Sequence, residues 1–263
     1  MLRVGFYQFR PRFGELEANS RRIEDALRGV EADLIVLPEL AFTGYLFRDR
    51  AELRLLAEVP EQSPSIAGLR RLCRDRGMHV VTGFAERAGS RLFNSALLIG
   101  PRGPLRRYRK IHLFNEEKRW FDAGDLPLEV HRVRGVRLGM MVCFDWVFPE
   151  VARTLALAGA DLLCHPSNLV LDHCQRVMRA RCLENGVFAV TANRIGADQR
   201  PQARLRFTGR SQVVDPAGRV LCAATAARER LAVVEIDPRA ARVKRITARN
   251  HLLKDRRPQF YAG

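Results

Sequence analysis

ADLIVLPE at residues 32–39 is echoed by ADLLCHPS at residues 160–167, with the Ala-Asp-Leu start and the proline in register. Each stretch is short and mostly apolar, which is typical of a strand buried on both faces of a sheet. One such strand in each half of the chain predicts two similar β/α layers. We therefore expect an α/β fold in which two related sheets pack as a pseudo-symmetric sandwich.

The segments around these two stretches alternate between strand and helix periodicity. Expected strands span residues 2–9, 78–85, 92–99, 105–109, 128–133, 136–142, 187–193, 212–214, 220–222 and 231–236, with another around Phe207. Expected helices span residues 16–30, 51–56, 65–76, 149–159 and a segment with a capping box at Asp172 and Gln175 that Asn185-Gly186 closes. We expect one domain over residues 1–263, with a basic arm from about residue 239 onward at the surface or a dimer interface.

The formal net charge of +16 suggests a nucleic-acid partner, because clustered cations release counterions from a phosphate backbone. However, only four of the 45 basic residues are lysines, and the arginines are scattered among acids along the expected helices and loops. That distribution indicates a solvated surface rather than a binding stripe. We therefore expect no nucleic-acid partner.

The composition is that of an ordinary globular protein, with 47% hydrophobic and 28% charged residues. The first residues lack the long apolar region of a signal peptide, and no segment approaches the run of about 20 apolar residues that spans a membrane. The six cysteines form no CxxC pair, so neither a disulfide scaffold nor a zinc site is expected. These features predict a cytoplasmic protein without a membrane partner.

Residues 136–150, VRLGMMVCFDWVFPE, place Cys143 between an expected buried strand and a helix that begins at Pro149. This is the context of a nucleophile elbow. A thiol there can project from a sharp turn, and a neighbouring cation can lower its pKa. The alternative is that Cys143 is a small hydrophobic residue of the core.

Three blocks that occur in order support the first interpretation. They are LPE at 37–39 with FTGY at 42–45, YRKIHLF at 108–114, and CFDW at 143–146 with FPE at 148–150. Together they resemble the nitrilase superfamily of carbon–nitrogen hydrolases, and the resemblance spans nearly the whole chain. FDAGD at 121–125, RCLEN at 181–185 and Asn193-Arg194 resemble the same family. The resemblance implies a four-layer α-β-β-α sandwich, in agreement with the repeated strand.

The resemblance also implies roles for individual residues. Glu39 corresponds to the general base, Lys110 to the cation that stabilises the oxyanion, and Cys143 to the nucleophile. The additional glutamate of the family maps to Glu117, which would orient Lys110 or position the leaving amine. A register shift of one residue would place Glu116 there instead, and the alternative for either acid is an exposed loop residue.

These residues account for hydrolysis without a metal or an organic cofactor. Glu39 takes the thiol proton, the thiolate attacks an amide carbon, and Lys110 with the backbone N–H after Cys143 stabilises the oxyanion. Collapse gives a thioester, which water activated by Glu39 hydrolyses. A nitrile would react through a thioimidate instead. The histidines form no ligand pattern, so no metal ligand is expected among them.

Candidate substrate contacts are Tyr45, Phe144, Trp146 and Asn168, which follow elements that should open on the pocket; the alternative is loop and core packing. The expected substrate is a small amide or N-carbamoyl compound, with a small aliphatic nitrile as the alternative. A third possibility is a non-catalytic basic binding protein on the same scaffold. Because members of this superfamily usually pair, we expect at least a homodimer, with residues 151–157 and the arm near Phe260 at the interface.

Overall fold

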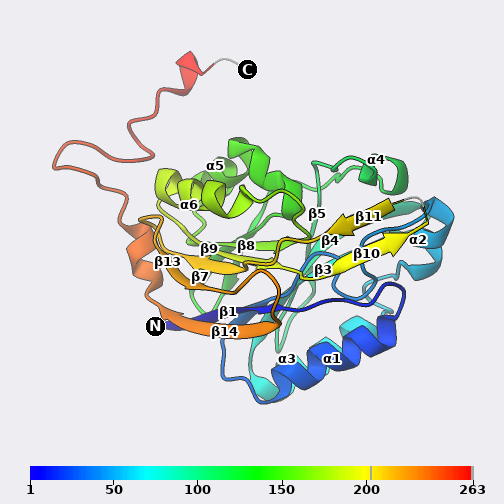
Figure 1. Cartoon of the computed structure of the whole chain (residues 1–263). Helices are drawn as coiled ribbons and strands as arrows, with labels where there is room; N and C mark the ends of the chain where they lie inside the picture. Colours follow the sequence, from blue (N-terminus) through cyan, green and yellow to red (C-terminus); the bar gives the residue numbers. More distant parts are fainter. Residues whose placement is uncertain (202, 262–263) are drawn as a thin grey trace.

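Two six-stranded sheets pack face to face between two layers of helices in the computed structural model, which describes residues 1–201 and 203–261 (Figure 1). The strands of the first sheet are β1 (Leu2–Gln8), β2 (Leu34–Val36), β3 (His79–Ala88), β4 (Arg91–Ile99), β5 (Arg106–Arg109) and β14 (Arg230–Ile236). Their order across the sheet is β14-β1-β2-β3-β4-β5.

The second sheet has the same number of strands. They are β6 (Val130–Val133), β7 (Val136–Met140), β8 (Leu162–Ser167), β9 (Phe188–Asn193), β12 (Gln212–Val214) and β13 (Val220–Ala223). Their order is β13-β12-β9-β8-β7-β6. A separate antiparallel hairpin consists of β10 (Ala197–Arg200) and β11 (Ala203–Arg206).

Helices cover the outer faces of both sheets. The α-helices are α1 (Leu16–Arg28), α2 (Arg50–Leu56), α3 (Pro64–Arg76), α4 (Glu117–Trp120), α5 (Pro149–Leu157) and α6 (Cys174–Asn185). The 3-10 helices are η1 (Cys143–Val147), η2 (Pro238–Arg242) and η3 (Pro258–Phe260). In Figure 1, α1 and α3 lie outside the first sheet and α5 and α6 outside the second. This arrangement confirms the expected four-layer α-β-β-α sandwich.

The two echoing stretches form equivalent central strands. β2 pairs in parallel with β1 and β3, and β8 pairs in parallel with β7 and β9. The aspartate before each strand makes the same contact: Asp33 Oδ2 accepts from the backbone N–H of Arg3 at 2.8 Å, and Asp161 Oδ2 accepts from that of Arg137 at 3.0 Å. The repeated sequence is therefore a repeated structural unit, which explains the pseudo-symmetry.

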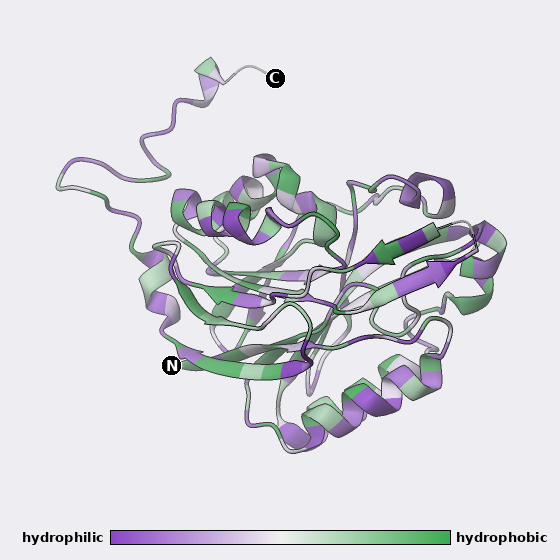
Figure 2. Ribbon diagram, viewed as in Figure 1, coloured by the Kyte–Doolittle hydropathy of each residue, from purple (hydrophilic) through white to green (hydrophobic). Residues whose placement is uncertain are grey.

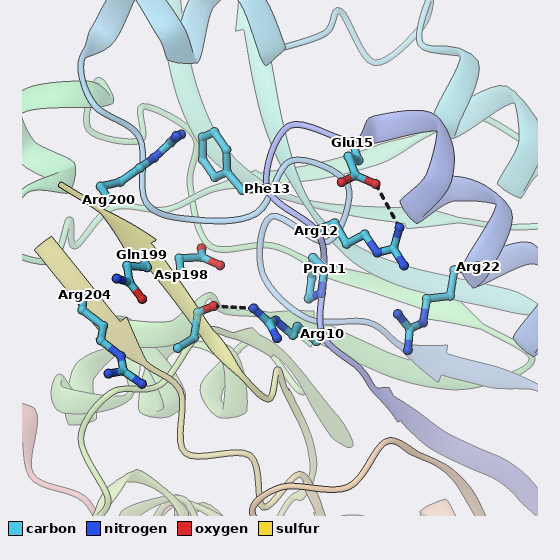
Figure 3. Close-up of a pocket in the computed structure, with 11 residues that line it drawn as sticks. Arg10, Pro11, Arg12, Phe13, Glu15, Arg22, Asp198, Gln199, Arg200 and Arg204 are labelled. Carbon is cyan, nitrogen blue, oxygen red and sulfur yellow. Dashed lines mark hydrogen bonds and ion pairs between the residues drawn. The ribbon is translucent and has the colours of Figure 1, made fainter.

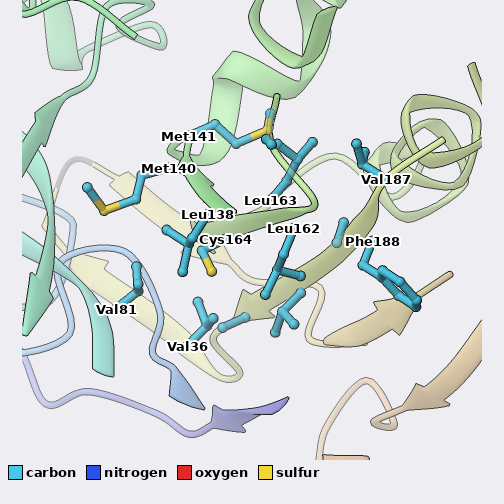
Figure 4. Packing of buried hydrophobic residues seen from close by; sticks show 14 of the residues in the cluster. Val36, Val81, Leu138, Met140, Met141, Leu162, Leu163, Cys164, Val187 and Phe188 are labelled. Atoms are coloured by element: carbon cyan, nitrogen blue, oxygen red, sulfur yellow. The ribbon is translucent and has the colours of Figure 1, made fainter. Parts of the chain in front are cut away.

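The main core fills the space between the two sheets. Figure 4 shows Val36 and Val81 of the first sheet beside Leu138, Leu162 and Cys164 of the second. All five side chains are buried. Since both inner faces are apolar, stacking removes them from water and holds together the strand ends that carry the candidate site.

Two sequence predictions differ from the structure. The N-cap of α6 is His173 with no side-chain hydrogen bond, so the capping box predicted at Asp172 and Gln175 is wrong. The side-chain amide of Gln175 instead donates to the carbonyl of Gly209 at 3.0 Å, a contact from a distant loop. The strand expected around Phe207 ends one residue earlier, at the end of β11.

After η2 the chain passes the C-terminal end of α6, where Lys244 Nζ donates to the carbonyls of Asn185 and Gly186, each at 2.7 Å. It then extends away from the sheets, and Figure 2 shows apolar and polar residues interspersed along it. Exposed apolar side chains of this arm are Val243, Ile246, Phe260 and Tyr261. Within the described residues, no helix combines the length and apolarity needed to cross a membrane.

Candidate active site

Glu39 lies in the loop after β2 and is fully buried. Its Oε1 accepts from Asn94 Nδ2 and from Lys110 Nζ, both at 2.7 Å, whereas Oε2 has no partner among the described residues. Gly83 of β3 permits this position, because a Cβ there would lie 2.2 Å from the Cα of Glu39. Two hydrogen bonds thus hold one carboxylate oxygen, and the other is unpaired among the described residues.

Lys110 follows β5 and is also buried. Its Nζ donates to Oε1 of Glu39 at 2.7 Å and to Oε1 of Glu117 at 2.8 Å. Burial disfavours the charged amine, but the two carboxylates outweigh it and raise the pKa of Lys110 above its usual value. The ammonium is therefore charged at neutral pH.

The two neighbouring glutamates have different environments. Glu117 is buried, and its Oε1 accepts from the Tyr45 hydroxyl at 2.7 Å in addition to Lys110. Burial raises the pKa of Glu117, while Lys110 opposes that shift. The side chain of Glu116 is 47% exposed and pairs with Arg119 at 2.9 Å. The structure therefore brings Glu117, and not Glu116, to Lys110.

Cys143 is the first residue of η1, at a sharp turn after β7, and has a φ of +40° in the left-handed region. Asp145 fixes this turn, since its Oδ2 accepts from the Val142 N–H at 2.8 Å and from the Tyr108 hydroxyl at 2.7 Å. His165 Nε2 donates to the Cys143 carbonyl at 2.9 Å. The turn has the backbone of the predicted nucleophile elbow.

The resting thiol differs from the sequence expectation. Burial, followed by the charge of Glu39, raises the pKa of Cys143 well above its usual value, and Lys110 only partly opposes this. Lys110 does lower the pKa of Cys143, as the sequence predicted, but burial and the charge of Glu39 outweigh it, so the net shift is upward. The side chains of Glu39, Lys110, Glu117 and Cys143 are all buried. Cys143 is neutral until a base takes its proton.

A small cavity of about 10 Å³ adjoins Cys143. Its other lining residues are Phe114, Phe144, Trp146, Asn168, Leu169, Val170 and Leu171. Asn168 is only 3% exposed, yet neither atom of its amide has a partner among the described residues. An unpaired buried amide is costly unless water or a ligand completes its hydrogen bonds. The cavity therefore offers an apolar wall with one polar contact.

Among the predicted substrate contacts, Phe144, Trp146 and Asn168 line this cavity and Tyr45 does not. The hydroxyl of Tyr45 is bound to Glu117, and its ring packs edge-on against Trp120. Tyr45 therefore lies behind the cluster and contacts an acid of the site.

Sequence reasoning missed three features of the site. Asn94 orients Glu39 from the middle of β4, Asp145 fixes the turn at Cys143, and residues 169–171 line the cavity. A buried amide within the apolar strand LFNSALLI could have identified Asn94. Asp145 lay within the quoted block, but no local pattern indicated its partners.

Comparisons with known proteins agree with this architecture. A family model described as carbon-nitrogen hydrolase matches residues 3–245. A protein from Pyrococcus abyssi named nitrilase is 42% identical over 264 residues, covering 99% of this chain and 99% of that protein. An (R)-stereoselective amidase from Pseudomonas sp. is 36% identical over 97% of this chain and 92% of its own length.

A solved structure of an amidase mutant from Nesterenkonia sp. AN1 has acrylamide added at its active-site cysteine. Its sequence is 29% identical to this chain. The match covers 93% of this chain and 97% of the amidase chain, with a TM-score of 0.80. The family model, the relatives and the shared fold confirm the resemblance stated from the three sequence blocks. The chain therefore belongs to the carbon-nitrogen hydrolase family and is an enzyme that acts on carbon–nitrogen bonds.

Proposed function

We propose that this enzyme hydrolyses a small amide or N-carbamoyl compound to an acid and ammonia, with Cys143 as nucleophile. The observation that carries this proposal is the buried cluster in which Lys110 bridges Glu39 and Glu117 beside the Cys143 turn. A thiol, a free carboxylate oxygen and a charged ammonium are the groups that acyl transfer requires. The cysteine adduct of the Nesterenkonia amidase supports the role of Cys143.

The first half of the reaction forms a thioester. Glu39 accepts the thiol proton on Oε2, the oxygen that has no partner among the described residues. The Cys143 sulfur bonds to the amide carbon, and the electron pair of the C=O bond moves to oxygen, where Lys110 and the Phe144 N–H stabilise it. When the C–N bond breaks, the proton on Glu39 passes to the leaving amine.

The second half restores the enzyme. Glu39, again a carboxylate, takes a proton from a water molecule that attacks the thioester carbon. The C–S bond breaks, and the same proton returns to the Cys143 sulfur. Glu117 holds Lys110 throughout and does not exchange protons with the substrate. One water is consumed for each acid and ammonia released.

The side chains that line the cavity favour an uncharged acyl group. Its wall is aromatic and aliphatic, and the unpaired amide of Asn168 can both donate and accept hydrogen bonds. No charged side chain lines it within the described residues. A small aliphatic nitrile is the second candidate, since the same attack on a nitrile carbon gives a thioimidate; the name of the Pyrococcus relative favours it.

Measuring ammonia release over a panel of amides, carbamoyl compounds and nitriles tests the proposal. We expect Cys143→Ala to abolish release, whereas Cys222→Ala, at a half-buried cysteine of β13, retains it. Activity on nitriles alone would establish the second candidate. Release by Cys143→Ala at the original rate would overturn the cysteine mechanism, and a non-catalytic basic binding protein would show no release with any compound.

We also propose that two copies pair through α5, α6 and the arm. Exposed apolar side chains on these segments support this: Leu157, Leu183, Val243, Ile246 and Phe260. Light scattering after size exclusion should give a dimer for the full chain and a monomer for a chain that ends at Arg242. A monomeric full chain, or a dimer from the shortened one, would contradict the proposal.

The cysteines are consistent with a cytoplasmic location, which we also propose. All six are free thiols in the described residues, and five are buried. Free thiols are usual where glutathione keeps proteins reduced.

A further inference from the structure

A second cavity, of about 750 Å³, opens between the segment after β1 and the β10–β11 hairpin (Figure 3). It shares no lining residue with the cavity at Cys143. Five arginines line it: Arg10, Arg12, Arg22, Arg200 and Arg204. Two acids, Glu15 and Asp198, are the only acidic residues of the wall within the described chain.

Three of these arginines have acidic partners. Arg12 pairs with Glu15 at 3.3 Å, Arg22 pairs with Glu229, and Arg200 pairs with Glu52 at 3.1 Å. Their positive charges are therefore partly balanced. They still contribute guanidinium N–H groups to the rim of the cavity.

The other two arginines have no acidic partner among the described residues. Arg10 donates to the carbonyl of Ala197 at 3.1 Å, the contact drawn in Figure 3, and the side chain of Arg204 makes no hydrogen bond or ion pair with the described residues. Asp198 does not compensate them, because both of its oxygens bind the buried guanidinium of Arg194 at 2.8 and 2.9 Å. The cavity therefore retains an excess of positive charge.

We propose that this cavity binds a compact polyanion, a molecule that carries a phosphate or diphosphate group, with Arg10 and Arg204 as its principal ligands. The planar guanidinium matches the oxygens of phosphate in a two-pronged contact, which favours arginine over lysine in such sites. Arg10 follows β1 and Arg204 lies on β11, so these two arginines come from opposite walls of the cavity. One ligand with several anionic oxygens can therefore bridge them. The volume suits a small molecule.

Calorimetric titration of the full chain with pyrophosphate, at constant ionic strength set with chloride, tests this site. We expect saturable binding with one site per chain. The double variant Arg10→Gln/Arg204→Gln should weaken it by about tenfold or more, the loss of two charge-assisted contacts. The control Arg71→Gln/Arg87→Gln removes the same charge from exposed positions outside the cavity and should change binding by less than about twofold.

Two results would overturn the proposal. One is the absence of saturable binding by the unmodified chain, and the other is equal weakening in both double variants, which would indicate diffuse attraction to a basic surface. Ammonia release by both variants shows that they are folded, since neither change touches the Cys143 cavity. A single charge reversal, Arg204→Glu, gives an independent check and should also weaken pyrophosphate binding.

Discussion

Lys110 and Glu117 form a buried ion pair whose evident effect is to position a charged amine. Removing charges from water costs several kcal/mol per ion, and their attraction repays this only when the geometry is good. Here one ammonium donates to one oxygen of each of two carboxylates, at 2.7 and 2.8 Å. The arrangement therefore fixes the position of a charged amine inside the protein.

Replacing Glu117 by Gln removes one of the two charges that hold Lys110. We expect kcat to fall by about 100-fold, the scale of losing one oxyanion contact, with a smaller change in KM. Steady-state measurement of ammonia release checks this. Glu116→Gln, at the adjacent exposed acid, is the control and should retain the original kcat. Equal losses in both variants would show that Glu117 has no special part.

His165 gives stability a pH dependence of known sign. Burial lowers its pKa to about 4, whereas an unfolded histidine titrates near ~6.5. Between these values the unfolded chain binds a proton that the folded chain does not, so stability falls as pH decreases from about 6.5 towards 4. The slope reaches about 1.4 kcal/mol per pH unit.

Urea unfolding between pH 7 and about 5 measures this contribution. In His165→Asn the free energy of unfolding should decline less steeply with decreasing pH than in the original chain, because asparagine does not titrate. His173→Asn, at a partly exposed histidine, should keep the original slope. Identical slopes for all three proteins would show that another group controls the acid range.

At the scale of elements, the site residues lie just after the ends of strands, and a glycine lets two of these segments pack closely. Glu39 follows β2, Lys110 follows β5, Cys143 follows β7 and Asn168 follows β8. In such sheets ligand sites form outside the carboxyl ends of the strands. Gly83 must leave room for the loop that carries Glu39.

Gly83→Ala should therefore displace the loop that carries Glu39. Its Cβ would meet the Glu39 Cα at 2.2 Å, a backbone atom that cannot rotate away. We expect a loss of about 1–3 kcal/mol in unfolding free energy, typical of overpacking, and a large loss of ammonia release. Gly29→Ala adds a Cβ where no atom lies within 4 Å, so both quantities should stay near their original values.

At the scale of the whole molecule, a buried ion pair ties the second half of the chain to the first. Asp198 of the β10–β11 hairpin binds Arg194, and its Oδ2 accepts from the backbone N–H of Tyr45 at 3.1 Å. Tyr45 in turn donates to Glu117. The hairpin is therefore linked to the acid that contacts Lys110.

Asp198→Asn should leave the Arg194 charge buried without a counter-charge. We expect a loss of about 3–5 kcal/mol of stability, together with lower ammonia release because the Tyr45 loop loses its acceptor. Urea unfolding and kinetics measure the two effects. The control Asp25→Asn removes an exposed partner of Arg28 and should change neither. Full stability of Asp198→Asn would contradict the linkage.

The sequence by itself determined the architecture and the family. The Ala-Asp-Leu repeat at residues 32 and 160 predicted two equivalent central strands, since a strand buried on both faces needs a continuous apolar run wherever it occurs. The Asn185-Gly186 pair in the sequence also predicted where α6 ends, because Gly186 adopts the left-handed conformation that few other residues adopt. Such features depend on neighbours along the chain.

Only the tertiary structure decided the features that depend on neighbours in space. It placed Glu117 rather than Glu116 against Lys110, turned Tyr45 towards that acid, and raised the pKa of Cys143 where a cation alone would lower it. The burial and charge around a site residue come from segments that are far apart in the sequence. Glu39 and Cys143, for example, are about a hundred residues apart. A local sequence pattern carries no information on the burial or the charge that distant segments create. Both were fixed only when the two sheets stacked.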